Sequence, residues 1–174
     1  SLDRRQRQMC IRDRMLGYEA DDLIASYAKA AIDEQMKVTI VSSDKDLMQL
    51  VREDVSMLDT MKNRLINKKE VIEKFGVEPD RVIDVQSLAG DSVDNIPGVP
   101  GIGIKTASLL INEYDNLDNL LENASNIKQN KRRESLIEFA DQARLSRKLV
   151  TLKEDIELPI PCLLYTSDAA DDRV

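Results

Sequence analysis

The sequence contains no histidine and no tryptophan, and aromatic residues make up 3% of its 174 residues. Without histidine, the chain lacks the commonest general base, the usual zinc ligand and every histidine-dependent catalytic triad. Its longest apolar runs are far shorter than the roughly 20 residues that cross a bilayer, and no signal-peptide core opens it. We therefore expect a soluble, cytoplasmic protein without a membrane partner, in which carboxylates and lysines carry any chemistry.

The charge balance is acidic, with 32 acidic against 25 basic residues and a formal net charge of −7. Attraction of the whole chain to phosphate therefore cannot be the basis of nucleic-acid binding, although a local basic patch can be. With 42% hydrophobic and 33% charged residues, the composition is that of one globular unit or two small ones.

The two ends differ in pattern from the segments that they adjoin. A DNA sequence that encodes residues 4–14 has a reverse complement that encodes Cys162 to Asp171, and it resembles a sequencing-library transposase adapter. We interpret residues 1–14 and 162–174 as adapter-derived tails, with disordered natural tails as the alternative. Both cysteines, Cys10 and Cys162, lie in these tails, so cysteine usage does not indicate a redox compartment. On this interpretation the chain is a fragment.

The first half of the remaining sequence alternates between helical and strand patterns. Apolar residues recur at helical spacing over 20–32, and the β-branched run 38–41 follows as a buried strand. The pattern then predicts a helical turn over 44–51 and a strand over 55–58, with 64–66 as its pairing partner. This alternation is typical of a parallel α/β sheet.

The second half is helical in pattern. A turn-rich stretch covers 91–103, and we predict helices on either side of it, over 71–75, 82–88, 105–113, 117–121 and 131–149. We therefore place an α/β domain at residues 15–75 and an all-helical domain at 76–161.

Acidic residues gather in three short motifs. They are Glu19, Asp21 and Asp22 at a helix start, Asp44 and Asp46 just after a strand, and Asp91 and Asp94 in the turn-rich stretch. Acids in a first helical turn often only cap the helix, which is the alternative for each motif alone. Three motifs together favour a hard cation, because converging carboxylates repel one another unless a cation holds them.

The donor type indicates which cation. Carboxylate oxygens without histidine or cysteine suit Mg²⁺ or Mn²⁺ rather than Zn²⁺, and the residues after Asp46 do not fit an EF-hand loop. Two such ions held by carboxylates are a standard device for hydrolysing phosphodiesters.

The glycine-rich stretch 98–106 fits neither a P-loop nor a dinucleotide-binding fingerprint. We interpret it as two short helices joined by Gly101-Ile-Gly103, with Lys105 and Thr106 beginning the second helix. Backbone amides and one lysine at such a helix start can bind phosphate without reading bases, and an ordinary helix-turn-helix corner is the alternative.

Two basic clusters follow, Lys131-Arg132-Arg133 and the set Arg144, Arg147 and Lys148. They could contact a DNA backbone. The alternative is that they are solvated helix faces, as charge runs on helices usually are.

Four motifs together resemble the 5′ nuclease domains of bacterial DNA polymerase I, which belong to the flap endonuclease superfamily. The motifs are Gly-Tyr-Glu-Ala-Asp-Asp at 17–22, Ser-Ser-Asp-Lys-Asp-Leu-Met-Gln-Leu at 42–50, Gly-Asp-Ser-Val-Asp-Asn at 90–95 and Pro-Gly-Ile-Gly-Ile-Lys-Thr-Ala at 100–107. The similarity covers residues 15–161 in the family's order and spacing. It implies a truncated PIN-like, or resolvase-like, parallel sheet followed by a helix-hairpin-helix DNA-binding domain.

The resemblance also implies an activity, which is Mg²⁺-dependent 5′→3′ exonuclease and flap endonuclease cleavage of DNA in replication and repair, with a polymerase domain in the same parent chain. Glu19, Asp21 and Asp22 then match ligands of a first metal ion, and Asp44, Asp46, Asp91 and Asp94 match ligands of a second. The hairpin around Gly101 and Gly103 matches the family's grip on duplex phosphates, where backbone carbonyls of Val99 and Ile102 would hold K⁺.

The chain also departs from this family. We expect family members to have an upstream strand and helix with two further metal-binding aspartates, followed by a helical arch that threads the flap. This chain begins after these elements. It also lacks the central strand of the family's sheet. A catalytically incomplete duplex DNA-binding fragment is therefore the main alternative. A PIN-like ribonuclease is another, but such domains lack the long helical part with its glycine hairpin.

Overall fold

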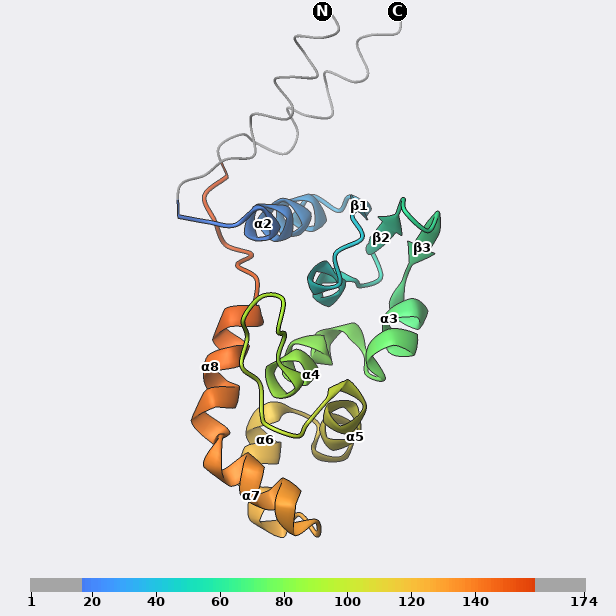
Figure 1. The fold of residues 1–174 in the computed structure, drawn as a ribbon. Coiled ribbons are helices and arrows are strands. Elements are labelled where there is room, and N and C mark those ends of the chain that lie inside the picture. The colour runs from blue at the N-terminus through green and yellow to red at the C-terminus, as the bar shows by residue number, and fades with distance from the viewer. Residues whose placement is uncertain (1–16, 159–174) are drawn as a thin grey trace, which may run out of the picture. The chain divides into compact units, whose positions relative to one another are not determined.

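The computed structural model describes residues 17–158 and divides the chain into two compact units. Among the described residues, unit 1 holds 17–40 and 152–158, and unit 2 holds 41–151 (Figure 1). The predicted adapter-derived tails, 1–14 and 162–174, lie outside the described residues. No helix within 17–158 is both long enough and apolar enough to cross a membrane.

Unit 1 is built around helix α2 (Ala20–Asp33), which is followed by strand β1 (Val38–Val41). The helix buries Leu23, Ala25, Ala28 and Ala31 along one stripe, as its apolar spacing predicts. The C-terminal segment of the unit is tied to this helix through Ser26, which is 3% exposed. Its Oγ donates to the Lys153 carbonyl at 3.0 Å and accepts from the Ile156 N–H at 3.2 Å. The predicted helix over 20–32 and the strand over 38–41 are confirmed.

Unit 2 opens with the short 3₁₀ helix η1 (Asp46–Leu50) and a β-hairpin. The hairpin consists of β2 (Val55–Asp59) and β3 (Arg64–Ile66), paired antiparallel with Met57 opposite Ile66. A parallel pair needs a crossover, and the connection over residues 60–63 is too short for one. Asp59 Oδ1 accepts from the Met61 N–H at 3.0 Å and from the Lys62 N–H at 3.2 Å, which fixes that turn. The predicted strands and their pairing are confirmed.

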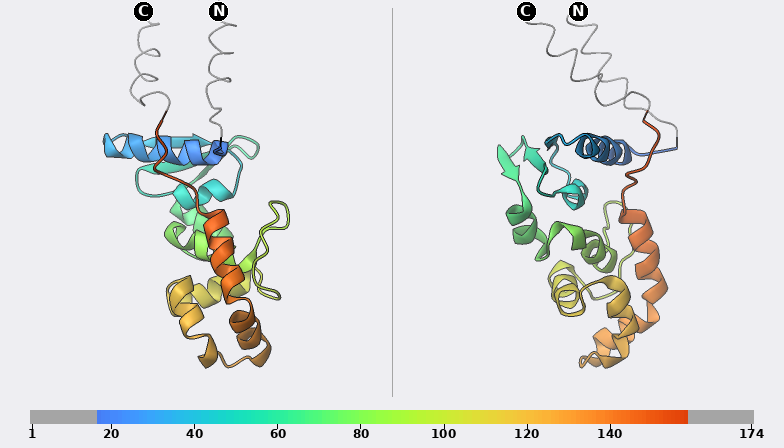
Figure 2. Two further views of the ribbon diagram at one scale, coloured as in Figure 1. Left: turned by 90° about the vertical axis from the view of Figure 1, so that its left-hand side faces the viewer. Right: turned by 180° about the vertical axis from the view of Figure 1, so that it is seen from behind.

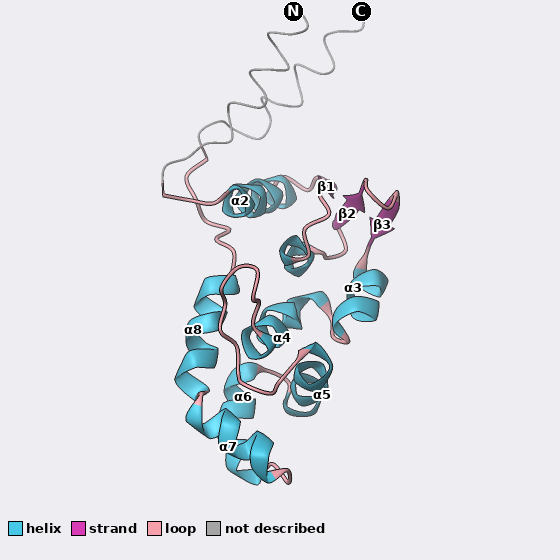
Figure 3. Ribbon diagram, in the orientation of Figure 1, coloured by secondary structure: helices cyan, strands magenta, loops and turns pink. Residues whose placement is uncertain are grey.

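The rest of unit 2 is helical, and within it no strand follows β3 (Figure 3). Helix α4 (Val82–Ala89) is at its centre and packs against α5 (Ile104–Tyr114) and α8 (Ala140–Val150). The side chains of Val82, Val85 and Leu88 in α4 are fully buried. The helices are α3 (Lys68–Phe75), η2 (Pro79–Arg81), α4 (Val82–Ala89), α5 (Ile104–Tyr114), α6 (Leu117–Glu122), η3 (Ala124–Asn126), α7 (Asn130–Glu138) and α8 (Ala140–Val150).

The prediction of one continuous helix over 131–149 is wrong, because the segment forms two helices that meet at Phe139. Phe139 has φ −104° and ψ 21°, outside the α-helical range. Helix α7 packs against η3, whereas α8 packs against α4, so the two halves have different partners. Apolar periodicity cannot reveal this break, since both halves keep a helical spacing.

The prediction that Gly101-Ile-Gly103 directly joins two helices is also wrong. Helix α4 ends at Ala89, α5 begins at Ile104, and residues 90–103 connect them as a non-helical loop (Figure 2). The loop contains Pro97 and Pro100, and Gly98 and Gly101 have φ values of +60° and +80°. Because prolines and left-handed residues interrupt helices, no helix forms directly before Gly101. The second predicted helix does begin here, with Lys105 and Thr106 in its first turn.

Candidate functional site

The acidic residues at the start of α2 lie in unit 1 and form a helix cap. Glu19 is the N-cap residue, and it forms a capping box with Asp22. The Glu19 N–H donates to Asp22 Oδ2 at 3.3 Å, and the Lys153 N–H donates to Asp22 Oδ1 at 2.9 Å. Both carboxylate oxygens of Asp22 are thus engaged within the unit. Asp21 lies in the same first turn and is half-buried. These contacts cap helix α2, and metal binding by the same carboxylates stays a prediction.

Asp44 and Asp46 lie in unit 2, where the chain leaves β1 and enters η1. The Asp44 N–H donates to Ser42 Oγ at 3.0 Å, and Asp44 Oδ1 accepts from the Asp46 N–H at 3.0 Å. Asp46 Oδ1 accepts a hydrogen bond from Gln86 Nε2 of helix α4. Burial raises the pKa of Asp46 above its ordinary value, and repulsion from Asp44 adds to this, while the Gln86 bond opposes it. A half-buried carboxylate beside another carboxylate is a group that a cation would stabilise.

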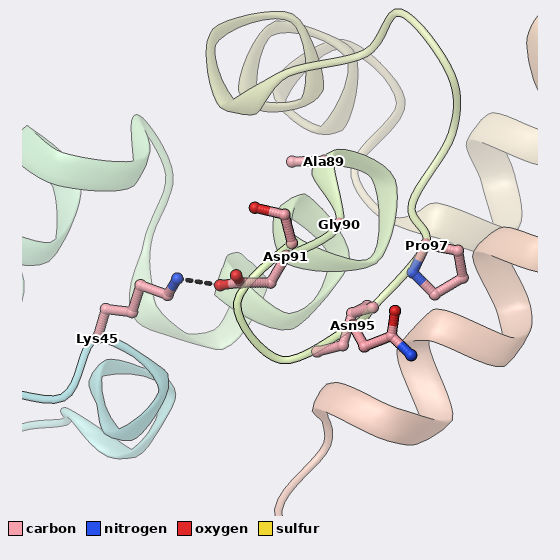
Figure 4. Close-up of a pocket in the computed structure, with 8 residues that line it drawn as sticks. Lys45, Ala89, Gly90, Asp91, Asn95 and Pro97 are labelled. Atoms are coloured by element: carbon pink, nitrogen blue, oxygen red, sulfur yellow. Dashed lines mark hydrogen bonds and ion pairs between the residues drawn. The ribbon is translucent and has the colours of Figure 1, made fainter.

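Asp91 and Asp94 lie on the loop after α4. Backbone hydrogen bonds of 2.9 and 2.7 Å between Asp91 and Ile96 close this part of the loop. Asp91 Oδ1 accepts from the Val93 N–H at 2.8 Å, and Asp91 Oδ2 forms an ion pair with Lys45 Nζ (Figure 4). The Lys45 ammonium holds the pKa of Asp91 below its ordinary value. Lys45 and the loop line a cavity of about 580 Å³.

The fold of unit 2 brings three of its four predicted site acids, Asp46, Asp91 and Asp94, near Lys45. The negative charges of Asp91, Asp46 and Asp94 raise the pKa of Lys45. Besides burial, the charges of Asp44 and Asp94 in turn raise the pKa of Asp46. Within residues 17–158, however, no three acidic side chains are close enough together to hold a metal ion. In this arrangement Lys45 forms an ion pair with Asp91, and Lys74 lies within electrostatic reach of Asp44 and Asp46. The remaining three predicted acids, Glu19, Asp21 and Asp22, belong to unit 1.

Sequence reasoning missed two residues of this cluster, Lys45 and Gln86. Lys45 stands between Asp44 and Asp46, so a cation inside an acidic motif was the available signal. Gln86 lies on the buried face of α4 and is only 6% exposed, and its Oε1 has no hydrogen-bond partner. A glutamine among apolar helix positions was the signal there, because buried polar groups normally need a partner.

The glycine-rich turn has a well-defined backbone. The Val99 carbonyl accepts from the Ile102 N–H at 3.1 Å, and both of these side chains are buried. Gly103 is the N-cap residue of α5, and the Gly103 carbonyl accepts from the Thr106 N–H at 2.9 Å. Gly101 and Lys105 are exposed.

The predicted basic residues lie at the start of α7. Lys131 is exposed and Arg132 is half-buried. The Arg133 guanidinium donates to the Ile127 carbonyl at 3.0 Å and to Asn130 Oδ1 at 2.8 Å, so it stabilises the start of the helix. In the second basic cluster, Arg144 and Arg147 form ion pairs with Asp141 and Asp118.

Two family models cover nearly the whole chain. Residues 77–172 match "5′-3′ exonuclease, C-terminal SAM fold". Residues 9–76 match "5′-3′ exonuclease, N-terminal resolvase-like domain". The chain belongs to the 5′-3′ exonuclease family. This confirms the resemblance drawn from the four motifs, and with it the fold class of a resolvase-like part followed by a helical domain.

Individual relatives agree. The chain is 57% identical over 144 residues to the DNA polymerase I of Rhizobium leguminosarum, an alignment that covers 83% of this chain and 14% of that protein. It is 41% identical over 144 residues to the 5′-3′ exonuclease of Aquifex aeolicus, covering 83% of this chain and 48% of that protein. The chain therefore spans less than half of either relative.

A solved structure has the same fold. The flap endonuclease of bacteriophage T5, crystallised as a pseudo-enzyme-product complex with DNA and metal ions, matches with a TM-score of 0.73 at 25% identity. The match covers 91% of this chain and 56% of that chain.

Proposed function

We propose that the chain is part of a 5′→3′ exonuclease and structure-specific 5′-flap endonuclease that hydrolyses DNA phosphodiesters within a DNA polymerase I. The observation that carries this proposal is that exonuclease family models match both halves of the chain, alongside a relative that is itself a DNA polymerase I. The parent protein would then act in replication and repair, with a polymerase domain in the same chain. The cytoplasmic location expected from the sequence fits this function.

The proposed cofactors are two Mg²⁺ or Mn²⁺ ions. The donor chemistry of the predicted site fits them, because all seven side chains are carboxylates and hard divalent cations prefer oxygen ligands. Bound ions of this kind activate water and neutralise the leaving oxygen of a phosphodiester. The T5 relative, crystallised with DNA and metal ions, supports a metal cofactor. Glu19, Asp21 and Asp22 would serve one ion, and Asp44, Asp46, Asp91 and Asp94 the other.

The chain's own contribution is to orient these carboxylates. Gln86 holds one oxygen of Asp46, and the Val93 N–H holds one oxygen of Asp91. The other oxygen of Asp91, Oδ2, pairs with Lys45. Carboxylates positioned in advance lose less conformational freedom when they take up a ligand.

The proposed DNA contacts lie in the helical part of unit 2. Backbone amides at the start of α5, with Gly101, Gly103, Lys105 and Thr106, would contact phosphates without reading the sequence, and the carbonyls of Val99 and Ile102 would hold K⁺. Lys131 and Arg132 would follow the backbone further along. We expect a smaller contribution to DNA binding from Arg133, because its guanidinium already donates to two partners within the chain.

The test compares this chain with a version extended at its N-terminus by the corresponding segment of the Aquifex 5′-3′ exonuclease. Both are incubated with 5′-flap DNA and Mg²⁺, with EDTA as the control. We expect metal-dependent cleavage by the extended protein. Asp46→Asn and Asp94→Asn should abolish cleavage, and Asp54→Asn is the matched control on an exposed aspartate of the same unit. Retained cleavage in Asp46→Asn and Asp94→Asn would contradict the metal assignments.

The alternative is a catalytically incomplete fragment that binds duplex DNA. It is favoured specifically by the capping role of Asp22 and by the absence, within residues 17–158, of three gathered acids. If neither protein cuts flap DNA but this chain binds duplex ends with a strong salt dependence, the binding function is the correct one.

A further inference from the structure

Lys45 is the lysine within the acidic motif at 44–46, and it faces the loop after α4. Its Nζ forms an ion pair with Asp91 Oδ2, and the Asp91 side chain is only 11% exposed while that of Lys45 is 36% exposed. Figure 4 shows the lysine reaching across the cavity to Asp91. Among the described residues this is the only ion pair that any of the four predicted acids of unit 2 forms. It joins two parts of the chain that are 46 positions apart in sequence.

The oxygens around this ion pair have other partners. Asp91 Oδ1 accepts from the Val93 N–H, Asp46 Oδ1 accepts from Gln86, and Asp44 Oδ1 accepts from the Asp46 N–H. Lys45 therefore occupies the oxygen of Asp91 that the Val93 N–H does not contact. Asp46 and Asp94 are also near enough to stabilise its charge.

The repulsion among the surrounding carboxylates explains why the positively charged Lys45 lies beside Asp91. Carboxylates that converge repel one another, and the repulsion falls when a positive charge lies among them. Lysine suits an exchangeable role, because its ammonium is a compact charge on a flexible four-carbon stem and does not clamp a carboxylate in a fixed fork as arginine does.

We propose that Lys45 is a built-in counter-ion that holds Asp91 in the metal-free protein, and that a divalent cation must displace it to bind there. The inference rests on the proposed function, which assigns Asp91 as a ligand. Since the lysine and the metal ion compete for the same oxygen, the ion pair lowers the apparent metal affinity in proportion to the fraction of molecules in which the pair is open. It also keeps the loop after α4 next to η1 before metal arrives.

The experiment measures Mn²⁺ binding to the 174-residue chain at equilibrium, by the loss of the free Mn²⁺ signal in electron paramagnetic resonance. Lys45→Met should bind Mn²⁺ about fivefold more tightly than the wild type, in line with the modest strength of ion pairs open to solvent. Lys45→Arg keeps a charge that can pair with Asp91 and can clamp it in a fixed fork, so this variant should bind Mn²⁺ no more tightly than the wild type.

Removal of any nearby positive charge also attracts cations, so the control is Lys74→Met. Burial lowers the pKa of Lys74, and the negative charges of Asp46 and Asp44 oppose this, so Lys74 lies within electrostatic reach of both acids. Among the described residues it forms no ion pair with Asp91. Lys74→Met should therefore tighten binding much less than Lys45→Met. A second readout is the NMR signal of the Lys45 side-chain methylene next to Nζ, which should shift as Mg²⁺ is added to the wild type.

The outcomes separate this inference from the proposed function. If the wild type binds Mn²⁺ but Lys45→Met binds equally, more weakly, or no more tightly than Lys74→Met, the counter-ion role is wrong and the metal proposal stands. If neither the wild type nor Lys45→Met binds Mn²⁺, both the metal proposal and the counter-ion role are refuted.

Discussion

Gly98 is the residue whose replacement most directly tests how the acidic loop after α4 is built. Its φ is +60°, and a Cβ added there would lie 2.5 Å from the Gly90 backbone nitrogen and 2.7 Å from the Ala89 carbonyl carbon. Helix α8 also holds the Gly98 backbone in place. The Gly98 carbonyl accepts from Gln142 Nε2 at 2.6 Å, and the Gly98 N–H donates to Ser146 Oγ at 3.3 Å. Residue 98 can approach the start of the loop at Ala89 and Gly90 this closely only without a side chain.

Two costs add up in Gly98→Ala. A left-handed conformation costs a non-glycine residue about 1–2 kcal/mol. Forcing extra atoms into a packed site costs roughly a further 1–3 kcal/mol. The lower entropy of alanine in the unfolded chain offsets about 0.4–1 kcal/mol of this. We therefore expect a loss of about 1–4.6 kcal/mol in the free energy of unfolding, with a midpoint of about 3 kcal/mol.

Gly101→Ala is the matched control in the same loop. Gly101 has a φ of +80°, but nothing lies within 4 Å of an added Cβ, so only the conformational cost applies. We expect a loss of about 1 kcal/mol, measured for both variants by urea denaturation followed by circular dichroism at pH 7. Equal destabilisation by the two substitutions would refute the close approach of the loop ends as the reason for glycine at 98.

Three further predictions concern other contacts. Ser26→Ala leaves the Ile156 N–H without its partner and should cost about 1–3 kcal/mol, with faster hydrogen exchange at the Ile156 amide; unchanged exchange would contradict the tether in unit 1. Asn116→Ala removes the cap that accepts from the Asn119 N–H at 2.8 Å and should cost about 1 kcal/mol in urea denaturation, whereas Asn116→Gly should cost only a few tenths. Arg147 lowers the pKa of Asp118 in the folded protein, so their ion pair stabilises above the unfolded pKa and is lost as the pH falls through the folded pKa. Asp118→Asn should therefore cost at most about 1 kcal/mol at pH 7 and progressively less below pH 4, as urea titrations at several pH values would reveal.

Local pattern was sufficient for most elements. The helix at 20–33, the strands at 38–41, 55–59 and 64–66, and the start of the helix at 104 all follow from apolar spacing, β-branched runs and turn residues. One expectation was wrong for a tertiary reason and one for a local reason. The helix over 131–149 divides at Phe139, and its halves pack on different partners. No helix forms directly before Gly101 because Pro97, Pro100 and the left-handed Gly98 and Gly101 interrupt it.

The sequence by itself determined which residue types are present for chemistry. It places paired carboxylates in three motifs, excludes histidine, and identifies the family through motif order, which the family models confirm. These properties are local, because each motif is a run of neighbouring residues.

Only the tertiary structure decided which side chains meet. Lys45 pairs with Asp91 across 46 positions of sequence, and Gln86 reaches Asp46 across 40. The structure also shows that both carboxylate oxygens of Asp22 accept hydrogen bonds, one from the Glu19 N–H in the cap of α2 and one from the Lys153 N–H. Such pairings depend on how η1, α4 and the loop after it pack together, and no short-range pattern encodes the contact between residues that are far apart in the chain.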